Sequence, residues 1–155
     1  MDMVFTEEQR LLADSAREFL TERCSTVALR RLRAARDPLG YEPEAWRQMV
    51  ELGWTAIPFP ESIGGLDFGY RGLGAVFEQM GRTLAASPLL SSVVLGGSAL
   101  LLGGSPEQRA AHIPAIIRGE RRLVLAVDEG RHHDPAAISL AARRAGDSWL
   151  LDGDK

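Results

Sequence analysis

Titratable side chains gather in one short stretch near the carboxyl end of the sequence, where Asp128 and Glu129 precede Arg131-His132-His133-Asp134. Imidazole and carboxylate groups together could bind a metal ion or move a proton. Adjacent histidines serve a metal poorly, because neighbouring side chains of an extended segment point to opposite faces. We therefore favour a solvated loop over a metal site.

The other chemistry-bearing residues favour structural roles. Cys24 is the single cysteine, so neither an intramolecular disulfide nor a cysteine-rich metal site is possible. We expect His112 at a helix surface or a domain interface rather than in catalysis. Packing is the expected role of the three tryptophans, Trp46, Trp54 and Trp149.

Charge and composition exclude several classes of partner. The 155 residues carry a formal net charge of −3, with 45% hydrophobic and 25% charged residues. This is ordinary for a soluble globular chain and gives no electrostatic reason to expect nucleic acid or an anionic membrane. Residues 1–10 contain a charged run where an export signal has its apolar core. The apolar stretch 88–102 is too short to span a bilayer. We expect a cytoplasmic protein.

The elements that position these residues begin with a helix. Thr6-Glu7-Glu8-Gln9 fits a capping box. An apolar stripe at spacings of three and four follows: Leu12, Ala16, Phe19, Leu20, Cys24 and Val27. The pattern predicts one long helix whose basic end, Arg30 to Arg33, complements the helix dipole. For these arginines a solvated helix end is favoured over a nucleic-acid site. Residues 37–40 then break the helix.

Four further helices are predicted from caps and breakers. Residues 55–65, with two prolines and a double glycine, cannot be regular structure. Within the last predicted helix we expect a kink or early break at Pro114. The predicted helices run from Pro43 to Gly53, from about Gly69 to Leu84, from Ser87-Pro88 to Gly103-Gly104, and from the capping box Ser105-Pro106-Glu107-Gln108 to Gly119.

After Arg122 the pattern changes to short β-type runs, predicted at 123–127, 138–142 and 149–151. Asp152-Gly153 is typical of a hairpin turn, but only two residues follow it. The predicted fold class is mainly α. An all-helical domain occupies residues 1–121, and residues 122–155 begin a β-domain that we expect to be incomplete.

Three segments, taken in order, resemble the acyl-CoA dehydrogenase family. Residues 52–66, with Pro60-Glu61 and Gly64-Gly65, are similar to its leucine-glycine helix end, proline-glutamate and double glycine. Residues 103–120 resemble the last helix of its amino-terminal domain. Residues 145–155 resemble its hairpin with an asparagine-glycine-x-lysine turn, which places the family lysine at Lys155. Each motif is weak alone; their order and spacing over nearly the whole chain identify it as a member.

The resemblance implies a helical amino-terminal domain, a β-barrel-like middle domain and a carboxyl-terminal four-helix domain. It also implies FAD as cofactor and an acyl-CoA as substrate. The implied partners are an electron-transferring flavoprotein or similar acceptor and further subunits in a homo- or hetero-oligomer. In the family a carboxylate removes the α proton while the flavin takes the β hydride. That base lies in the carboxyl-terminal domain, so no catalytic residue is expected here.

The family's flavin loop, threonine-glutamate-proline followed by glycine-serine-aspartate, is matched by residues 127–134. Asp128 stands at the threonine, Gly130 replaces the proline, and Asp134 matches the aspartate if one residue is deleted. The resemblance thus implies FAD contacts from Val127, Asp128, Glu129 and Asp134. Arg131 could instead reach the CoA phosphates. An ionised Asp128 can only accept hydrogen bonds, so backbone N–H groups must take over the donation, or the contact is weakened.

Several readings stay open beside the dehydrogenase. The altered loop favours a non-catalytic subunit that pairs with a complete partner. Flavin oxidases and monooxygenases of the same fold share the amino-terminal architecture. A flavin-free helical interaction module is disfavoured, because it would leave an unpaired β edge after Leu151. The resemblance also places a family glutamate at Glu78, where we expect a structural ion pair.

Overall fold

The computed structural model describes residues 4–155. Residues 1–3, which belong to the segment interpreted as lacking an export signal, lie outside the described residues. The chain divides into two compact units, one ending at Val124 and the other running from Leu125 to Lys155. Each unit is described by itself.

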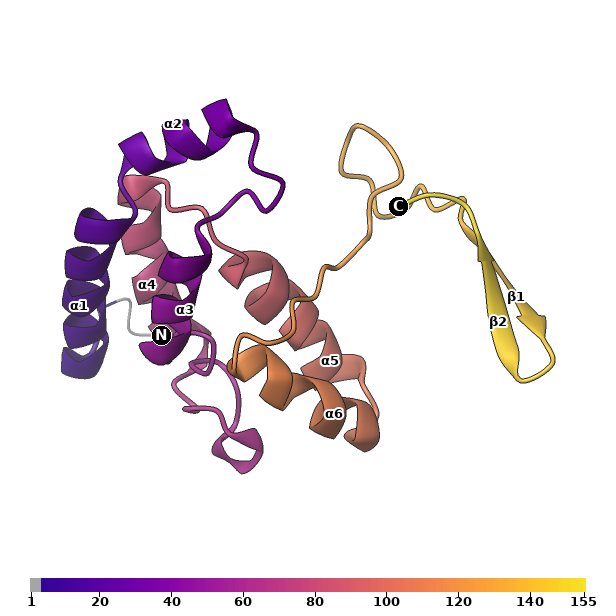
Figure 1. The fold of residues 1–155 in the computed structure, drawn as a ribbon. Coiled ribbons are helices and arrows are strands. Elements are labelled where there is room, and N and C mark those ends of the chain that lie inside the picture. The colour runs from indigo at the N-terminus through magenta and orange to yellow at the C-terminus, as the bar shows by residue number, and fades with distance from the viewer. Residues whose placement is uncertain (1–3) are drawn as a thin grey trace. The chain divides into compact units, whose positions relative to one another are not determined.

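The first unit is built entirely of helices joined by turns (Figure 1). None of the described helices is long and apolar enough to cross a membrane. In chain order the helical elements are α1 (Glu7–Arg23), α2 (Thr26–Ala35), α3 (Pro43–Glu51), the 3₁₀ turn η1 (Glu61–Ile63), α4 (Gly69–Thr83), the π-helix η2 (Leu89–Gly97), α5 (Ser98–Gly103) and α6 (Pro106–Ile117).

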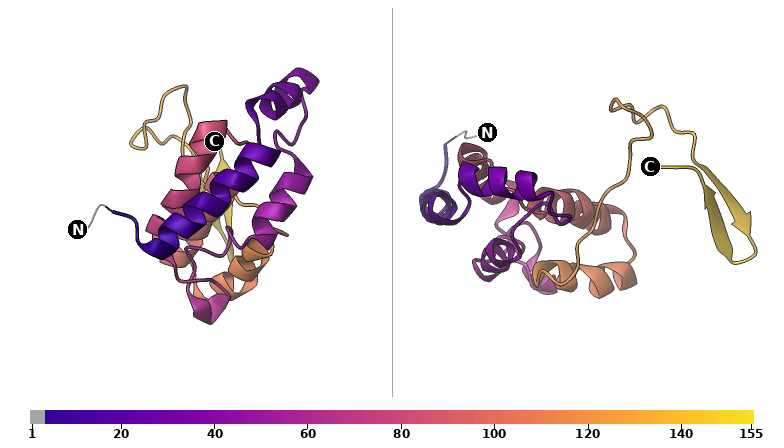
Figure 2. Two further views of the ribbon diagram at one scale, coloured as in Figure 1. Left: turned by 90° about the vertical axis from the view of Figure 1, so that its left-hand side faces the viewer. Right: turned by 45° about the horizontal axis from the view of Figure 1, so that its top comes forward.

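Helix α1 begins at the predicted capping box. The Thr6 side chain accepts from the Gln9 N–H at 3.2 Å, and the Gln9 side chain accepts from the Thr6 N–H at 3.1 Å. Helices α1 and α4 lie side by side in both views (Figures 1 and 2). Ala16 and Leu20 of α1 are fully buried, as is Val76 of α4. Ala16 and Leu20 of the predicted apolar stripe therefore lie in the core.

The single long helix predicted from residue 7 to residue 33 is wrong. Cys24 leaves the helical region at φ −119° and ψ 52°, and Ser25 starts α2 by accepting a hydrogen bond from the Ala28 N–H at 3.3 Å. A serine competes well for a helix N-terminus because its hydroxyl satisfies an orphan N–H. The break turns Val27 outward, and its side chain is 69% exposed. Helix α2 contains no buried residue.

The core of the first unit lies around α3 and the irregular segment that follows it. Trp46 and Met49 of α3 are buried, as is Trp54, whose ring meets Phe19 edge-on at 5.4 Å. Residues 55–65 form turns and the short η1, as the prolines predict. A Cβ at Gly65 would lie 1.9 Å from the Phe59 carbonyl oxygen, so only glycine fits there.

The apolar segment after Ser87 differs from the single helix expected. Residues 89–97 form a π-helix before α5 begins. The wide turn coincides with Gly96 and Gly97, where a Cβ would come within 2.5 Å of Leu123 Cβ and of the Phe59 ring. Ser92 ties this element to the chain leaving the domain, because its hydroxyl donates to the Leu123 carbonyl and accepts from the Leu123 N–H.

Helix α6 begins at the predicted capping box of Ser105 and Gln108. The early break expected at Pro114 is wrong, since the helix continues to Ile117. Pro114 falls close to the helix end, and buried Ile113 and Ile116 hold the last turn in the core. The Thr55 hydroxyl donates to the Ile117 carbonyl at 2.6 Å and so satisfies a carbonyl of the last turn.

The second unit contains one antiparallel hairpin of β1 (Ala141–Ala145) and β2 (Ser148–Asp152). Arg144 pairs with Trp149, and Gly146 takes φ +64° in the turn. The strand predicted at 123–127 is wrong: no strand forms there, and Leu123 exchanges hydrogen bonds with the Ser92 hydroxyl. The strand predicted at 138–142 begins three residues later than expected.

Candidate functional site

The predicted flavin loop, residues 127–134, runs between the helical unit and the hairpin without regular structure. Asp128 and His133 face each other, with Asp128 Oδ1 2.8 Å from His133 Nδ1, and both side chains are largely exposed. The Asp134 carboxylate accepts from the Ala136 N–H at 3.1 Å and so closes a local turn. Among residues 4–155 no three His, Cys, Asp or Glu side chains gather as a metal ligand set.

Glu129 turns away from its exposed neighbours, and its side chain is only 9% exposed. One carboxylate oxygen accepts from the Ser139 N–H at 2.6 Å and also from the Ser139 hydroxyl. The other accepts from the Leu140 N–H at 3.0 Å and lies 2.7 Å from Lys155 Nζ. These donors, with Lys155 the strongest, lower the pKa of Glu129 to about 2.

Lys155 supplies the cation of this cluster. Its ammonium group also donates to the Val127 carbonyl at 3.1 Å. Its side chain is 21% exposed. The structure therefore brings together three segments that the sequence separates: the loop at Val127 and Glu129, the residues before β1, and Lys155. We call this set of contacts the Glu129 hub.

Sequence reasoning missed Ser139 and Leu140 as members of the site. They follow Glu129 by 10 and 11 residues, and no periodic pattern links those positions. Both residues lie within the strand predicted at 138–142, which is why the sequence did not indicate them as site residues. The one signal that pointed to the hub was the resemblance, which named both Glu129 and Lys155 without pairing them.

The loop leaves its backbone donors free. Within the described part of the chain, the N–H groups of residues 127–134 donate to no other protein group. N–H groups without a protein partner suit an electron-rich ligand such as the carbonyl edge of a flavin ring or a phosphate. The loop therefore fits the donor role that Asp128 cannot take. Arg131 is exposed on the same loop, next to these donors.

The remaining candidates lie where they serve structure. His112 is half-buried on α6 and accepts from the Arg121 guanidinium. The ion pair expected at Glu78 forms with Arg82 at 3.3 Å. Trp46 and Trp54 pack in the core, but the packing role expected for Trp149 is wrong, because its side chain is 65% exposed. The hairpin that carries it has no layer behind it among residues 125–155.

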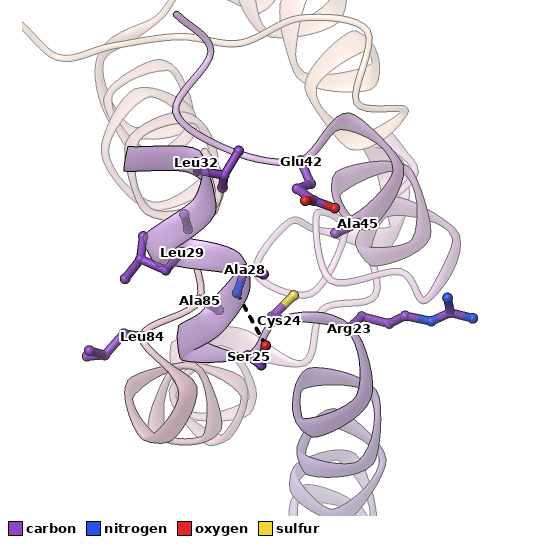
Figure 3. A pocket seen from close by; sticks show the side chains of 11 residues that line it. Arg23, Cys24, Ser25, Ala28, Leu29, Leu32, Glu42, Ala45, Leu84 and Ala85 are labelled. Atoms are coloured by element: carbon purple, nitrogen blue, oxygen red, sulfur yellow. Dashed lines mark hydrogen bonds between the residues drawn. The ribbon is translucent and has the colours of Figure 1, made fainter. Parts of the chain in front are cut away.

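A small hollow opens at the break between α1 and α2 (Figure 3). The Cys24 sulfur points into it, Leu29 and Leu32 line the α2 side, and Leu84 points away. Burial raises the pKa of the Cys24 thiol, and the nearby Glu42 carboxylate raises it further. A protonated, buried thiol is a poor nucleophile, so Cys24 is not poised for nucleophilic chemistry in this hollow.

Known proteins match the chain along most of its length. The profile of the acyl-CoA dehydrogenase N-terminal domain matches residues 6–120. A 3-(aryl)acrylate reductase of Clostridium sporogenes is 31% identical over 156 residues, which cover 99% of this chain and 40% of the relative. Acyl-CoA dehydrogenase FadE27 of Mycobacterium tuberculosis is 34% identical over 115 residues, which cover 74% of this chain and 30% of the relative.

A solved structure shows the same fold. The ChsE4-ChsE5 complex from Mycobacterium tuberculosis contains a chain that superposes with a TM-score of 0.84 at 31% identity. The match covers 99% of this chain and 40% of that one. The chain thus spans about two fifths or less of the length of the proteins to which it is similar.

Proposed function

Because the chain belongs to the acyl-CoA dehydrogenase family, we propose that it works as part of an FAD-dependent acyl-CoA dehydrogenase. In this proposal residues 1–121 form the helical domain and residues 122–155 begin the flavin-binding β-domain. The observation that carries the proposal is the loop of residues 127–134. Its backbone N–H groups have no protein partner, and the contacts of the Glu129 hub hold the start of the loop in place.

The proposed flavin contacts come from the backbone of this loop. Val127, Asp128 and Asp134 would present N–H groups to a flavin carbonyl or to the substrate thioester. FAD, when bound, supplies the hydride acceptor that no side chain can replace. The His133 imidazole supports this role, because its Nδ1 lies 2.8 Å from Asp128 Oδ1 and so occupies part of that carboxylate.

The proposed substrate is an acyl-CoA thioester oxidised between its α and β carbons. The α C–H bond is a weak acid, and hydrogen bonds to the thioester carbonyl acidify it. The base that removes this proton is not assigned to any residue of this chain. Arg131, exposed beside the loop, would bind a phosphate of CoA through its guanidinium group.

An electron acceptor and further subunits belong to the same proposal. A flavin reduced by substrate must pass its electrons on, and an electron-transferring flavoprotein or a similar acceptor would receive them. The similarity to a 3-(aryl)acrylate reductase supports assays of both thioester oxidation and enoyl thioester reduction, because hydride transfer between flavin and substrate is reversible in principle. We propose a homo- or hetero-oligomer as the working assembly.

A second candidate function is a non-catalytic subunit of a heteromeric dehydrogenase. Two observations favour it: Asp128 and Gly130 depart from the family loop, and a chain of the ChsE4-ChsE5 complex is among the similar structures. In that arrangement the complete flavin site would need a residue set from the partner subunit.

The test is the spectrum of the purified full-length protein. We expect flavin absorbance that an acyl-CoA bleaches under anaerobic conditions, or flavin that an enoyl thioester reoxidises after reduction. A colourless, folded protein that takes up no added FAD would contradict the proposal. Uptake of FAD only after co-expression with a second family subunit would favour the heteromeric candidate instead.

A further inference from the structure

The loop of residues 127–134 is held by polar contacts among the described residues. None of the residues from 125 to 155 is buried, and only Val127, Glu129 and Leu140 are half-buried. The polar contacts that hold the loop converge on Glu129.

The Glu129 carboxylate has little capacity left for a ligand. An ionised carboxylate offers about four acceptor positions on its two oxygens. Here four donors occupy them: the Ser139 N–H, the Ser139 hydroxyl, the Leu140 N–H and the Lys155 ammonium group. A cofactor that approached this side chain would have to displace one of them.

The backbone near Lys155 is shaped to complete the cluster. Gly153 takes φ +137°, and a Cβ there would lie 3.1 Å from the Leu140 Cα. A larger residue would push this segment away from Leu140, and Lys155 would move with it. The close approach of two backbones thus delivers the lysine to Glu129 and to the Val127 carbonyl.

We infer that Glu129 is a positioning residue of the proposed flavin site: it anchors the base of the residue 127–134 loop through Lys155 and the Ser139-Leu140 backbone, and does not touch the cofactor. The assignment to a flavin site rests on the proposed function. The anchoring itself rests on the contacts within this chain. It replaces the sequence-based expectation that Glu129 contacts FAD directly.

The anchoring predicts that Glu129 and Lys155 act as one unit. Either substitution, Glu129→Gln or Lys155→Met, removes the charged pair and frees the loop base. Each should raise the Kd for FAD about tenfold, as expected for one lost charge-assisted contact. The double variant should be no worse than either single one, because both remove the same contact.

The experiment uses the full-length protein and two readouts. Amide hydrogen exchange of residues 127–140 is followed in flavin-free protein, and the FAD Kd is measured by quenching of flavin fluorescence. Asp147→Asn is the matched control, because it removes one exposed carboxylate from the hairpin turn of the same unit. Helix content from circular dichroism confirms that each variant is folded.

We expect both hub variants to speed exchange at Ser139 and Leu140 about tenfold, while the control changes neither exchange nor FAD affinity. Weaker FAD binding in Glu129→Gln with unchanged exchange and no effect of Lys155→Met would mean direct contact and would overturn the inference. Unchanged exchange in both variants would overturn it as well. If the parent protein binds no FAD, the proposed function fails, and the exchange data still decide whether Glu129 anchors the loop.

Discussion

The helical unit and the hairpin unit are stabilised by different physical forces. In the first unit, large apolar side chains such as Trp54, Phe59 and Leu20 are almost fully buried. In the second, no residue from 125 to 155 is buried as a whole, and the Glu129 carboxylate accepts from four donors. The first unit should therefore respond to changes in packing volume, and the second to changes in charge and pH. The candidate site lies in the part of the chain that packing does not protect.

The largest difference in stability between the two units is expected at their tryptophans. Trp54→Ala should destabilise the helical unit by about 3–5 kcal/mol, because a side chain that is 1% exposed leaves a cavity. Urea unfolding followed by circular dichroism measures this loss. The matched variant Trp149→Ala, at a side chain 65% exposed, should change stability by less than about 0.5 kcal/mol. Equal effects at the two positions would break the distinction between the units.

Two glycines of the helical unit test whether close packing stabilises it. Gly65→Ala should cost about 3 kcal/mol, since its Cβ would meet the Phe59 carbonyl oxygen at 1.9 Å. Gly74→Ala is the control: α4 has open space at that position, and alanine should stabilise the helix by about 1 kcal/mol. Thermal unfolding of the two variants should move Tm in opposite directions, and a shift of the same sign would contradict the packing account.

The break between α1 and α2 predicts a smaller effect. Ser25→Ala removes the hydroxyl that accepts from the Ala28 N–H and should cost about 1 kcal/mol. Ser25→Gly should cost only a few tenths, because glycine tolerates the cap position. Amide exchange across residues 26–35 measures the difference. Equal losses for both variants would show that the cap does not hold this break.

The hairpin unit should loosen at the Glu129 hub as the pH falls. The pKa of Glu129 is lowered from its ordinary 4.5 to about 2, chiefly by Lys155. A carboxyl whose pKa is lowered by folding stabilises the folded form above its unfolded pKa, and that stabilisation is lost as the pH falls. The protection factors of Ser139 and Leu140, taken relative to the intrinsic exchange rate at each pH, should therefore fall between about pH 4.5 and pH 2. In Glu129→Gln this acid response should be absent; its persistence would assign the effect to another group.

The features predicted correctly from the sequence are those that depend on residues close together in the chain. Both capping boxes and the end of α3 near Gly53 involve residues three or four apart, and the structure has them where expected. Ser25 was missed because the apolar spacing continues through Cys24 and hides the second cap. The strand expected at 123–127 failed because an apolar run does not reveal whether a partner strand is present.

The candidate site was harder to predict for the same reason. The family resemblance predicts a flavin loop at residues 127–134, with departures at Asp128 and Gly130, and this assignment stays a prediction. The Glu129 hub depends on Ser139, Leu140 and Lys155, which meet only after the chain has folded back. Resemblance could therefore name Glu129 as a site residue but could not distinguish anchoring from contact.

Amide exchange with and without FAD tests the central claim most directly. In the full-length protein, FAD should slow exchange at residues 127–134, whose N–H groups are free in this structure. It should leave Ser139 and Leu140 nearly unchanged, because Glu129 already accepts their hydrogen bonds. Protection by FAD at Ser139 and Leu140, with none at residues 127–134, would contradict the account.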